Sequence, residues 1–530
     1  MYERIEVSQV RPLKGAAYGE AFTLETGRCR DHRPDSAVYG GRADVGDAGE
    51  GSDVVDGHGW PADSFWLRMQ LLQQHDIEAI PRRSQRPRHS SWVRGLDGVV
   101  RQTAFVTDVL DDLAARGLIA ISTDEVALRK ALADGPLTYY CGFDPTAPSL
   151  HSGNLLQLMV MRALQRAGHQ PIVLIGGATG LIGDPKPNSE RRLHERELVA
   201  GWVERIRDQV RPFLENPVHA DPALRAPIYV NNLDWTEELS AIDFLRDIGR
   251  YFRVGRMLAK EAVSARLNSE LGISYTEFSY QILQALDFLM LYKRDGCVLQ
   301  TGGSDQWGNL IAGVDLVRRI EGVAVHALAT ELVTKSDGTK FGKSESGTVW
   351  LDPAMTSPYA FFQFWLNASD LDAQMWQRMF SERAMEAVET AGRASDAYPA
   401  ARVAQRLLAR ELTTLVHGAL ASEQAEAAGR ALFGTADLSD VDAETLSAAL
   451  DEAGITELDG PAPSLAALLQ MIGLADSLGQ ARRTVREGGG YLNNQRITDP
   501  EAVPDENDWL HGRYLVLRRG KRQVAGVRRA

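Results

Sequence analysis

The sequence predicts an α/β protein with a parallel sheet, followed by a helical segment and a small terminal module. Strand-like and helix-like runs alternate over residues 105–352, which is the pattern of a parallel sheet covered by helices. Residues 353–455 are rich in Ala and Leu with little strand composition, and residues 464–530 combine short apolar runs with arginines and glycines. We therefore expect three folded domains with these boundaries. An acidic stretch containing Gly and Pro, near residues 451–463, is expected to be a linker.

Residues 1–104 lack the periodic apolar pattern of a folded core. They are rich in Gly, Asp, Arg and Ser, contain the single lysine Lys14, and have one apolar patch over residues 66–72. Such a composition buries little apolar surface, so we expect a low-complexity, disordered extension. Translated GC-rich upstream DNA has the same composition, and one hypothesis is that the natural start lies near Val99 to Val106. The alternative is a real appendage whose apolar patch docks on the catalytic domain or a partner.

The composition is that of a soluble enzyme, which we expect in the cytoplasm. No apolar run reaches the ~18 residues of a membrane span, and the N-terminus lacks a signal-peptide pattern. Three cysteines without metal spacing indicate neither a disulfide framework nor a metal site. The net charge of −13 is unfavourable for an RNA binder unless the basic residues are concentrated somewhere. They are concentrated in the tail, at Arg513, Arg518, Arg519, Lys521, Arg522, Arg528 and Arg529.

A first candidate phosphate site follows the apolar run at residues 137–143, which predicts a buried strand. A helix is expected from Gly153 to Ala167, so His151 lies where the strand gives way to the helix. Helix N-termini bind anions, Gly153 permits close approach of a nucleotide, and His151 and Thr146 can donate to phosphate oxygens. Because the HSGN motif is short, a surface histidine near a helix cap is the simpler alternative.

A second candidate is the polar loop at residues 334–347, which carries Lys335, Lys340 and Lys343 among glycines. Lysines supply mobile positive charge for phosphate, although a solvated loop explains the same composition.

A third candidate lies between these two, where Tyr280, Gln284 and Asp287 are spaced to share one helix face. Asp287 lies between two apolar residues and therefore needs a partner there, unless this is merely a polar surface face.

Together these motifs resemble those of the bacterial tyrosyl-tRNA synthetases, which are class I aminoacyl-tRNA synthetases. Residues 151–154 resemble the family's HIGH signature and residues 340–344 its KMSKS signature, and three more family-like blocks lie between them at residues 176–185, 275–289 and 302–309. The resemblance covers residues 105–530.

This sequence departs from the family pattern at three places. Ser152 replaces the usual apolar second residue of the HIGH signature, and Asn154 its final histidine. The short stretch after Asp184 leaves open whether Lys186, Arg191 or Arg192 contacts the pyrophosphate.

The resemblance implies a Rossmann-like catalytic domain, a helical anticodon-side domain and a small RNA-binding module of the ribosomal small-subunit type. It also implies a homodimer that activates L-tyrosine with ATP and transfers it to tRNA(Tyr). Mg²⁺ would arrive with ATP as substrate, and no tightly bound cofactor or editing domain is expected.

The resemblance further implies roles for individual residues. Those expected to act in catalysis are Thr146, His151, Lys340 and Lys343. Those expected to bind tyrosine are Tyr280, Gln284 and Asp184 at its ammonium group, Asp287 and Tyr140 at its hydroxyl, and Gln300 and Gln306 near its carboxylate. Those expected to bind ATP are Gly142, Asp144, His151, Gly153, Asn154, Gly303, Asp305, Lys340, Lys343 and Ser344. Those expected to bind RNA are Arg482, Arg483, Lys521 and Arg522.

Two other function classes compete with the ligase. One is a catalytically weak relative that serves as an RNA-binding or splicing factor, which would have no need for an intact substrate pocket. The other is an unrelated nucleotidyltransferase on the same scaffold, because a fold does not determine function. The terminal RNA-binding pattern argues against the second class. A tryptophan-specific relative would have no reason to place Asp287 opposite Tyr140.

Overall fold

A computed structural model describes most of the chain from Asp108 onward. The described residues are 108–186, 189–215, 224–270, 272–339, 341–344, 347–434, 436–520 and 522–529. The expectations for residues 1–104, and the positions of Lys340 and Lys521, therefore lie outside the described residues.

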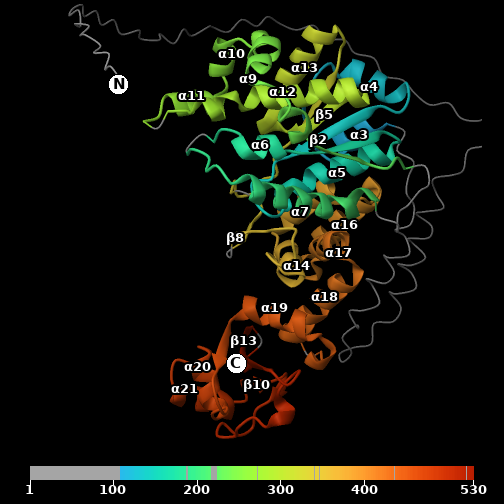
Figure 1. The fold of residues 1–530 in the computed structure, drawn as a ribbon. Helices are drawn as coiled ribbons and strands as arrows, with labels where there is room; N and C mark the ends of the chain where they lie inside the picture. Colours follow the sequence, from blue (N-terminus) through green and yellow to red (C-terminus); the bar gives the residue numbers. More distant parts are fainter. Residues whose placement is uncertain are drawn as a thin grey trace, which may run out of the picture. The chain divides into compact units, whose positions relative to one another are not determined.

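A six-stranded sheet forms the centre of the first domain (Figure 1). Its strands are β1 (Ile119–Ser122), β2 (Thr138–Phe143), β3 (Gln170–Ile175), β4 (Ile228–Asn231), β5 (Cys297–Gly303) and β6 (His326–Thr330). They follow the order β1-β6-β5-β2-β3-β4, in which all neighbours are parallel except β1 and β6. The predicted parallel sheet is confirmed, with one antiparallel strand added at its edge. The chain moves outward in opposite directions from β2 and β5, so their carboxyl ends form the switch point where such sheets bind ligands.

Helices cover both faces of this sheet (Figure 1). Successive residues of β2 point to opposite faces. Tyr139, Cys141 and Phe143 therefore share a core with α5 and α7, whereas Tyr140 packs with α12. The helices of this domain include α3 (Val109–Ala115), α4 (Glu125–Ala133), α5 (Ser152–Arg166), α6 (Gly177–Ile182), α7 (Arg196–Glu215), α12 (Tyr275–Asp295) and α13 (Trp307–Glu321). They also include α8 (Leu233–Thr236), α9 (Ala241–Asp243), η2 (Phe244–Ile248), η3 (Gly249–Tyr251), α10 (Val254–Leu258), α11 (Glu261–Leu267) and η4 (Ser304–Gln306).

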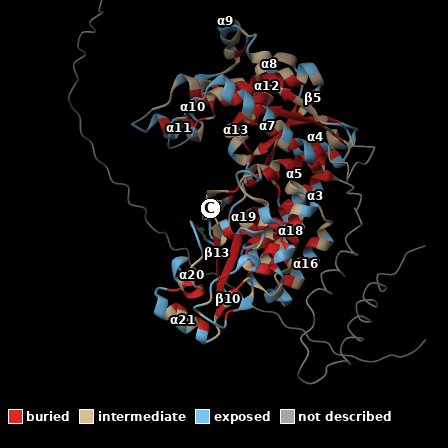
Figure 2. Cartoon of the chain, turned by 60° about the horizontal axis from the view of Figure 1, so that its bottom comes forward, coloured by how far each residue is buried: buried red, intermediate tan, exposed pale blue. Residues whose placement is uncertain are grey.

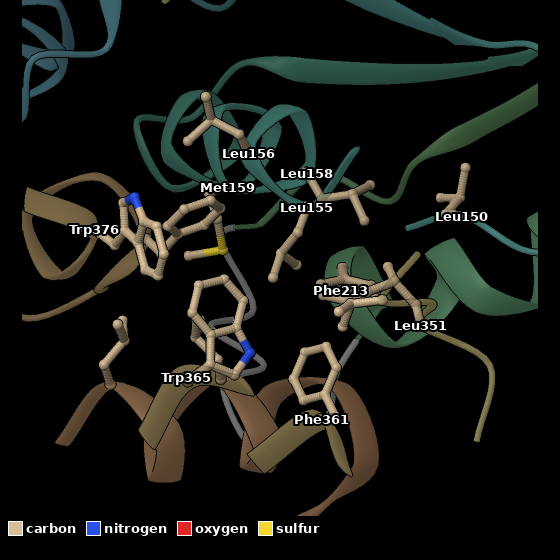
Figure 3. Close-up of a cluster of buried hydrophobic side chains, with 14 of the residues drawn as sticks. Leu150, Leu155, Leu156, Leu158, Met159, Phe213, Leu351, Phe361, Trp365 and Trp376 are labelled. Carbon is tan, nitrogen blue, oxygen red and sulfur yellow. The ribbon is translucent and has the colours of Figure 1, made fainter. Parts of the chain in front are cut away.

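The second domain is helical, as its composition predicts. Its helices are α14 (Pro358–Leu366), α15 (Asp370–Phe380), α16 (Met385–Ala397), α17 (Val403–His417), α18 (Ala419–Phe433) and α19 (Ala443–Ala453). Figure 2 shows that the buried residues lie in the strands and on the inward faces of the helices. Trp365 and Trp376 of this domain share a core with Leu155 and Met159 of α5 (Figure 3). The catalytic and helical domains are therefore packed directly against each other.

An ion pair reinforces this contact at the far end of α5. Arg162 donates from Nε and Nη2 to Glu382, at 2.5 and 2.9 Å, and Arg166 also pairs with the same carboxylate. Burial alone would raise the pKa of Glu382, but the charge of Arg166 and the hydrogen bond from Arg162 lower that pKa to about 2. Glu382 therefore stays ionised at neutral pH and fastens α5 to the chain that follows α15.

The terminal module contains α20 (Leu465–Met471) and α21 (Leu478–Arg486) beside a five-stranded sheet. The strands are β9 (Ile455–Leu458), β10 (Gly490–Leu492), β11 (Gln495–Arg496), β12 (Tyr514–Arg519) and β13 (Gln523–Arg529), in the order β11-β10-β12-β13-β9. The prediction of a linker over residues 451–463 is thus wrong, because β9 pairs in parallel with β13. The four residues of β9 lie in an acidic, glycine-containing stretch whose composition does not predict a strand. They form one because they pair with β13, which is distant in sequence.

The module is also packed on the helical domain. Tyr514 and Val516 of β12 share a core with Leu446 and Leu450 of α19. Arg518 donates to the carbonyl of Gly434 at 2.8 Å. Among the described residues, no helix is long and apolar enough to cross a bilayer.

The Glu382 ion pair generates the first prediction. Glu382→Gln removes the charge that balances the buried Arg162, so we expect a loss of about 3 kcal/mol in the free energy of unfolding at neutral pH. A carboxyl group whose pKa is lowered by folding stabilises the fold at pH values above its ordinary pKa. This contribution disappears as the pH falls through the folded-state pKa of about 2. The difference between variant and wild type should therefore shrink in acid. Urea denaturation across pH measures both, with the exposed Glu386→Gln as control. Equal stability of the variant and wild type at pH 7 would contradict the assignment.

Candidate active site

The predicted site residues gather at the carboxyl ends of β2 and β5. Asp144 and Thr146 directly follow β2, and Gly303 and Asp305 lie at the end of β5. Gly142 is an exposed position within β2 itself. Tyr140 and Gln300 are directly paired positions of the two strands. The sheet thus brings together residues about 160 positions apart, as the switch-point rule requires.

The HSGN motif caps α5. His151 is the N-cap residue, and its Nδ1 accepts from the Gly153 N–H at 3.1 Å while Asn154 Oδ1 accepts from the His151 N–H at 3.1 Å. A side chain at position 153 would meet the imidazole at 2.9 Å, so the close packing of the histidine requires glycine there. The exposed imidazole lies at the positive end of a 15-residue helix.

The polar loop at residues 334–347, which we call the lysine segment, and the residues that follow it meet this motif directly. The Ser152 N–H donates to the carbonyl of Val349 at 2.9 Å, and a Cβ at Gly342 would lie 2.7 Å from Ser152 Oγ. Gly342 has φ +76°, a conformation that favours glycine. Lys343 and Ser344 form β7 (Lys343–Ser344), which pairs with β8 (Gly347–Thr348). The side chains of Lys343 and Ser344 lie outside the described residues, so only their backbone is placed beside α5.

A chain of buried hydrogen bonds joins α12 to the ends of β2 and β4. Tyr280 donates from its hydroxyl to Asp144 Oδ2 at 2.6 Å, and Thr179 of α6 donates to Asp144 Oδ1 at 2.6 Å. Asn232, which is fully buried, donates to both Thr179 Oγ1 and Asp287 Oδ2 at 3.0 Å. The two carboxylates are therefore fixed relative to each other through two intervening side chains.

Asp287 lies at the buried end of this chain. It is 2% exposed and also accepts from Trp235 Nε1 at 3.0 Å. Burial raises the pKa of Asp287 to about 8, although the hydrogen bonds from Asn232 and Trp235 oppose the shift. Burial, and then the charge of Asp287, also raise the pKa of Tyr140, so its phenol keeps its proton.

Several buried polar atoms near Asp287 have no partner among the described residues. They are Tyr140 Oη, Gln284 Oε1 and Gln300 Oε1. The Tyr140 ring packs edge-on against Phe288, the residue after Asp287, with 5.3 Å between centroids. Unsatisfied buried polar groups are costly, so their accumulation around Asp287 indicates a site whose hydrogen bonds a polar ligand can complete.

Asp184 occupies a second polar cluster. It accepts from Gln306 Nε2 at 3.1 Å and from Asn309 Nδ2 at 3.4 Å, and Lys260 Nζ lies 3.5 Å away. Lys260 also donates to Asn309 Oδ1 at 2.7 Å. The carboxylate of Asp184 is therefore already balanced by a cation of this chain.

The structure distinguishes the basic residues that follow Asp184. Arg191 packs over Gly183 and donates from Nε to the Asp184 carbonyl at 2.7 Å. Its positive charge lowers the pKa of the exposed Lys186. Glu277 accepts from the Arg191 N–H at 2.8 Å and pairs with the buried Arg266 at 3.0 Å. Arg191 is thus anchored at the site, whereas Arg192 is exposed without such a contact in the described residues.

The basic tail is less available than its sequence indicates. Arg528 pairs with Glu457, Arg529 with Glu506, and the predicted RNA contact Arg482 with Glu501. Arg483 and Arg522 are exposed. Sequence reasoning counted charges in the tail but missed their acidic partners, which lie 19 to 71 residues away.

Sequence analysis also missed five residues of the two polar clusters: Thr179, Asn232, Trp235, Lys260 and Asn309. Asn232 could in principle have been predicted from the sequence, because it follows β4 at the same edge of the sheet where Asp144 follows β2. Lys260 gave no signal, since it lies between two short helices outside the recognised blocks.

Comparisons with known proteins agree with this geometry. Residues 132–434 match the family model "tRNA synthetases class I (W and Y)", and residues 446–525 match "Tyrosine--tRNA ligase SYY-like C-terminal domain". The chain is 60% identical over 425 residues to a tyrosine–tRNA ligase of Streptomyces avermitilis, covering 80% of this chain and 99% of the relative. A relative from Streptomyces coelicolor is 58% identical over 423 residues, with the same shares covered. A C-terminally truncated mitochondrial tyrosyl-tRNA synthetase of Aspergillus nidulans superposes with a TM-score of 0.57 at 27% identity, covering 65% of this chain and 99% of that one.

Proposed function

The chain belongs to the class I tRNA synthetases for tryptophan and tyrosine and is a tyrosine–tRNA ligase, and from this premise we propose how its own residues carry the reaction. The enzyme activates L-tyrosine with ATP to tyrosyl-adenylate and pyrophosphate, and then transfers the tyrosyl group to the 3′ terminal ribose of tRNA(Tyr). The observation that carries the proposal is the group of buried, unpartnered polar atoms beside Asp287.

Tyrosine enters with its phenol between Tyr140 and Asp287. Tyr140 Oη lacks a partner among the described residues, and a substrate hydroxyl supplies one while it also bonds the Asp287 carboxyl group. Phenylalanine would leave both groups unpaired in the interior, which is costly. Tyrosyl-tRNA synthetases are themselves the established example of this kind of discrimination. The same pocket explains why no separate editing site is needed.

The substrate ammonium group binds at the other end of the pocket. Gln284 Oε1 is a buried acceptor that has no partner in the described part of the chain, and the Tyr280 hydroxyl can accept while it donates to Asp144. Asp184 adds negative charge nearby, shared with Lys260. Gln300 and Gln306 then flank the carboxylate, which is the nucleophile.

ATP binds across the α5 N-terminus. Thr146 and His151 contact its phosphates with Lys340 and Lys343, while Gly142, Gly153 and Asn154 allow close approach of the nucleotide. Asp144, Gly303 and Asp305 bind the nucleoside, and Ser344 completes the lysine segment. Arg191, with Lys186 beside it, is placed to receive the pyrophosphate.

The chemistry needs no general base, because the tyrosine carboxylate is already ionised. It attacks the α-phosphorus of ATP, an O–P bond forms, and the bond to the departing pyrophosphate breaks. Positive groups that meet the developing charge on the phosphates lower the barrier. Mg²⁺ enters as part of the MgATP substrate, and we place the reaction in the cytoplasm, where tRNA and ATP are available.

The helical domain over residues 353–455 is proposed to face the anticodon side of tRNA, and the terminal module to bind its backbone. Arg483 of α21 and Arg522 are exposed cations on that module. Phosphate contacts by such residues give affinity that depends on salt. Lys521 adjoins Arg522 in sequence, and Arg482 can join only when it exchanges Glu501 for phosphate.

The enzyme is proposed to act as a homodimer through α9, α10, α11 and the start of α12. Figure 1 places these helices on the side of the sheet away from the helical domain. Together with η2 they expose apolar side chains, namely Ile242, Leu245, Val254, Leu258, Leu267 and Tyr275. A group of exposed apolar residues of this size marks an interaction surface, and a second copy is the partner that the family implies.

The dimer proposal is tested with Tyr275→Asp, which places a charge at an exposed aromatic residue of this surface. We expect sedimentation to show a shift from dimer to monomer at micromolar concentration, because burying an unpaired charge is costly. Leu420→Asp, at an equally exposed apolar residue of α18, should stay dimeric. A wild-type protein that sediments as a monomer would refute the proposal.

Specificity is tested with Asp287→Ala. Only tyrosine offers a hydroxyl to this group, so tyrosine should lose on the order of 2–4 kcal/mol in kcat/KM for activation, and phenylalanine far less. Pyrophosphate exchange with both amino acids measures the two losses. Asp234→Ala, at an exposed carboxylate beside Trp235, is the matched control. Equal losses for both amino acids would show that Asp287 is purely structural.

The lysine segment is tested with Lys343→Ala. Its charge acts on the developing phosphate charge, so we expect the activation rate to fall by roughly 10²–10³ with little change in tyrosine affinity. Lys340→Ala should behave similarly. Stopped-flow adenylate formation and equilibrium tyrosine binding separate the two quantities, and a parallel fall of both would exclude a transition-state role.

RNA binding is best tested without truncation, because removing residues from Ser464 onward would strip β9 of its partner strand and uncover Leu450. Arg483→Glu combined with Arg522→Glu should leave adenylate formation unchanged and strongly weaken tRNA charging. The slope of log tRNA affinity against log salt concentration should become shallower by the amount expected for the loss of about two phosphate contacts. Arg→Lys replacements at both positions keep the charge and should charge tRNA normally. Normal charging by the glutamate variant at physiological salt would contradict the assignment.

A further inference from the structure

The lysine segment is held by the helical domain as well as by α5. Its beginning is tied to α15: Asp372 Oδ1 accepts from the Ser336 N–H at 2.6 Å, and Trp376 donates from Nε1 to the Thr334 carbonyl at 3.1 Å. Asp372 is 6% exposed, so this hydrogen bond is shielded from water.

Capping of α15 does not account for Asp372. The N-cap residue of that helix is Ser369, which accepts from the Asp372 N–H and donates to Asp372 Oδ2 at 2.8 Å. The second carboxylate oxygen, Oδ1, is hydrogen-bonded to Ser336 alone among the described residues. A buried carboxylate oxygen that accepts a hydrogen bond from a loop N–H holds that loop in place, because losing the bond would leave the oxygen unsatisfied.

Phe341 provides a second point of attachment. Its ring lies among four aromatic rings of α14 and α15, with centroid distances of 5.0 to 5.7 Å, to Phe364, Trp365, Trp376 and Phe380. Trp365 and Trp376 are the same side chains that pack toward Met159 of α5 (Figure 3). The ring is therefore inserted where the catalytic and helical domains meet.

The two attachments determine where the following residues lie. Gly342, next after Phe341, rests against Ser152 at the start of α5, and its carbonyl accepts from the Val349 N–H at 3.0 Å. Lys343 comes directly after it in β7. Phe341 precedes Lys343 by two residues and Ser336 precedes it by seven, so a displacement at either attachment would be transmitted along this short segment to the lysine.

We propose that Asp372 and Phe341 are positioning residues through which the helical domain sets Lys343 against the ATP phosphates. This inference rests on the proposed role of Lys343. It adds that the activation rate depends on side chains of the helical domain that touch neither substrate. Misplacing a reacting group by about 1 Å costs up to ~10²-fold in rate, so the effect is measurable.

The test is a double-mutant cycle on adenylate formation in the full-length enzyme. Asp372→Ala should lower the activation rate by ~10–100-fold and raise KM for ATP, with tyrosine affinity within about twofold of wild type. In the Lys343→Ala background the same change should cost less than about twofold, because the residue it positions is gone. Phe341→Leu, which keeps apolar contact but loses the rings, should show the same pattern even if Asp372→Ala folds poorly.

Two controls separate positioning from general damage. Asp372→Asn keeps an oxygen for the Ser336 N–H and should restore most of the rate. Asp370→Ala, on the same turn but bonded to Gln405, should activate tyrosine normally. A full additional loss from Asp372→Ala in the Lys343→Ala background, or a parallel loss of tyrosine affinity, would overturn the inference. A normal rate in Lys343→Ala alone would overturn the role of the lysine itself, and the inference with it.

Discussion

The burial of the Asp287 carboxyl group is the constraint on which the proposed tyrosine site depends. An acid in this position is costly unless donors surround it, and Asn232 and an indole N–H supply two donors from the stretch after β4. Asn232 also reaches Thr179, which donates to Asp144, so the same requirement ties the ends of β2 and β4 to α12. The site is therefore organised before a substrate arrives. Among the residues that the structure describes, a few buried polar atoms, including the hydroxyl of Tyr140, remain unsatisfied, and these are the atoms proposed to bind tyrosine.

Helix α5 gives the enzyme a second axis of organisation. Its 15 residues span about 22 Å. One end presents His151, and the other end contacts Glu382 through two arginines. Between the ends, its apolar face lies on the aromatic core of the helical domain. One helix therefore connects the end of the catalytic domain proposed to bind ATP with the part of the molecule proposed to face tRNA.

Much of this architecture can be predicted from short stretches of sequence, and the elements that could not be predicted share one cause. The apolar run at 137–143 and the helix opening at His151 were predictable, because strand composition and cap chemistry are local. The face shared by Tyr280 and Asp287 follows from helical spacing alone. In contrast, β9 becomes a strand only because β13 lies beside it, and Arg528 is neutralised by a glutamate 71 residues earlier. Where the stabilising partner is distant in sequence, composition and periodicity carry no record of it.

The pairing of β9 has a consequence for how the chain is made. Because β9 is an edge strand, β13 is its one neighbour among the described strands of the terminal sheet, and β13 comes after α20, α21, β10, β11 and β12 in the chain. Synthesis proceeds from the N-terminus, so β9 and the face of α19 that meets β13 leave the ribosome well before their partner exists. The catalytic and helical domains can close while translation continues, but the terminal sheet cannot be completed until β13 has been made. A ribosome that stops before β13 would deliver a folded catalytic domain joined to a terminal module with an unpaired strand edge.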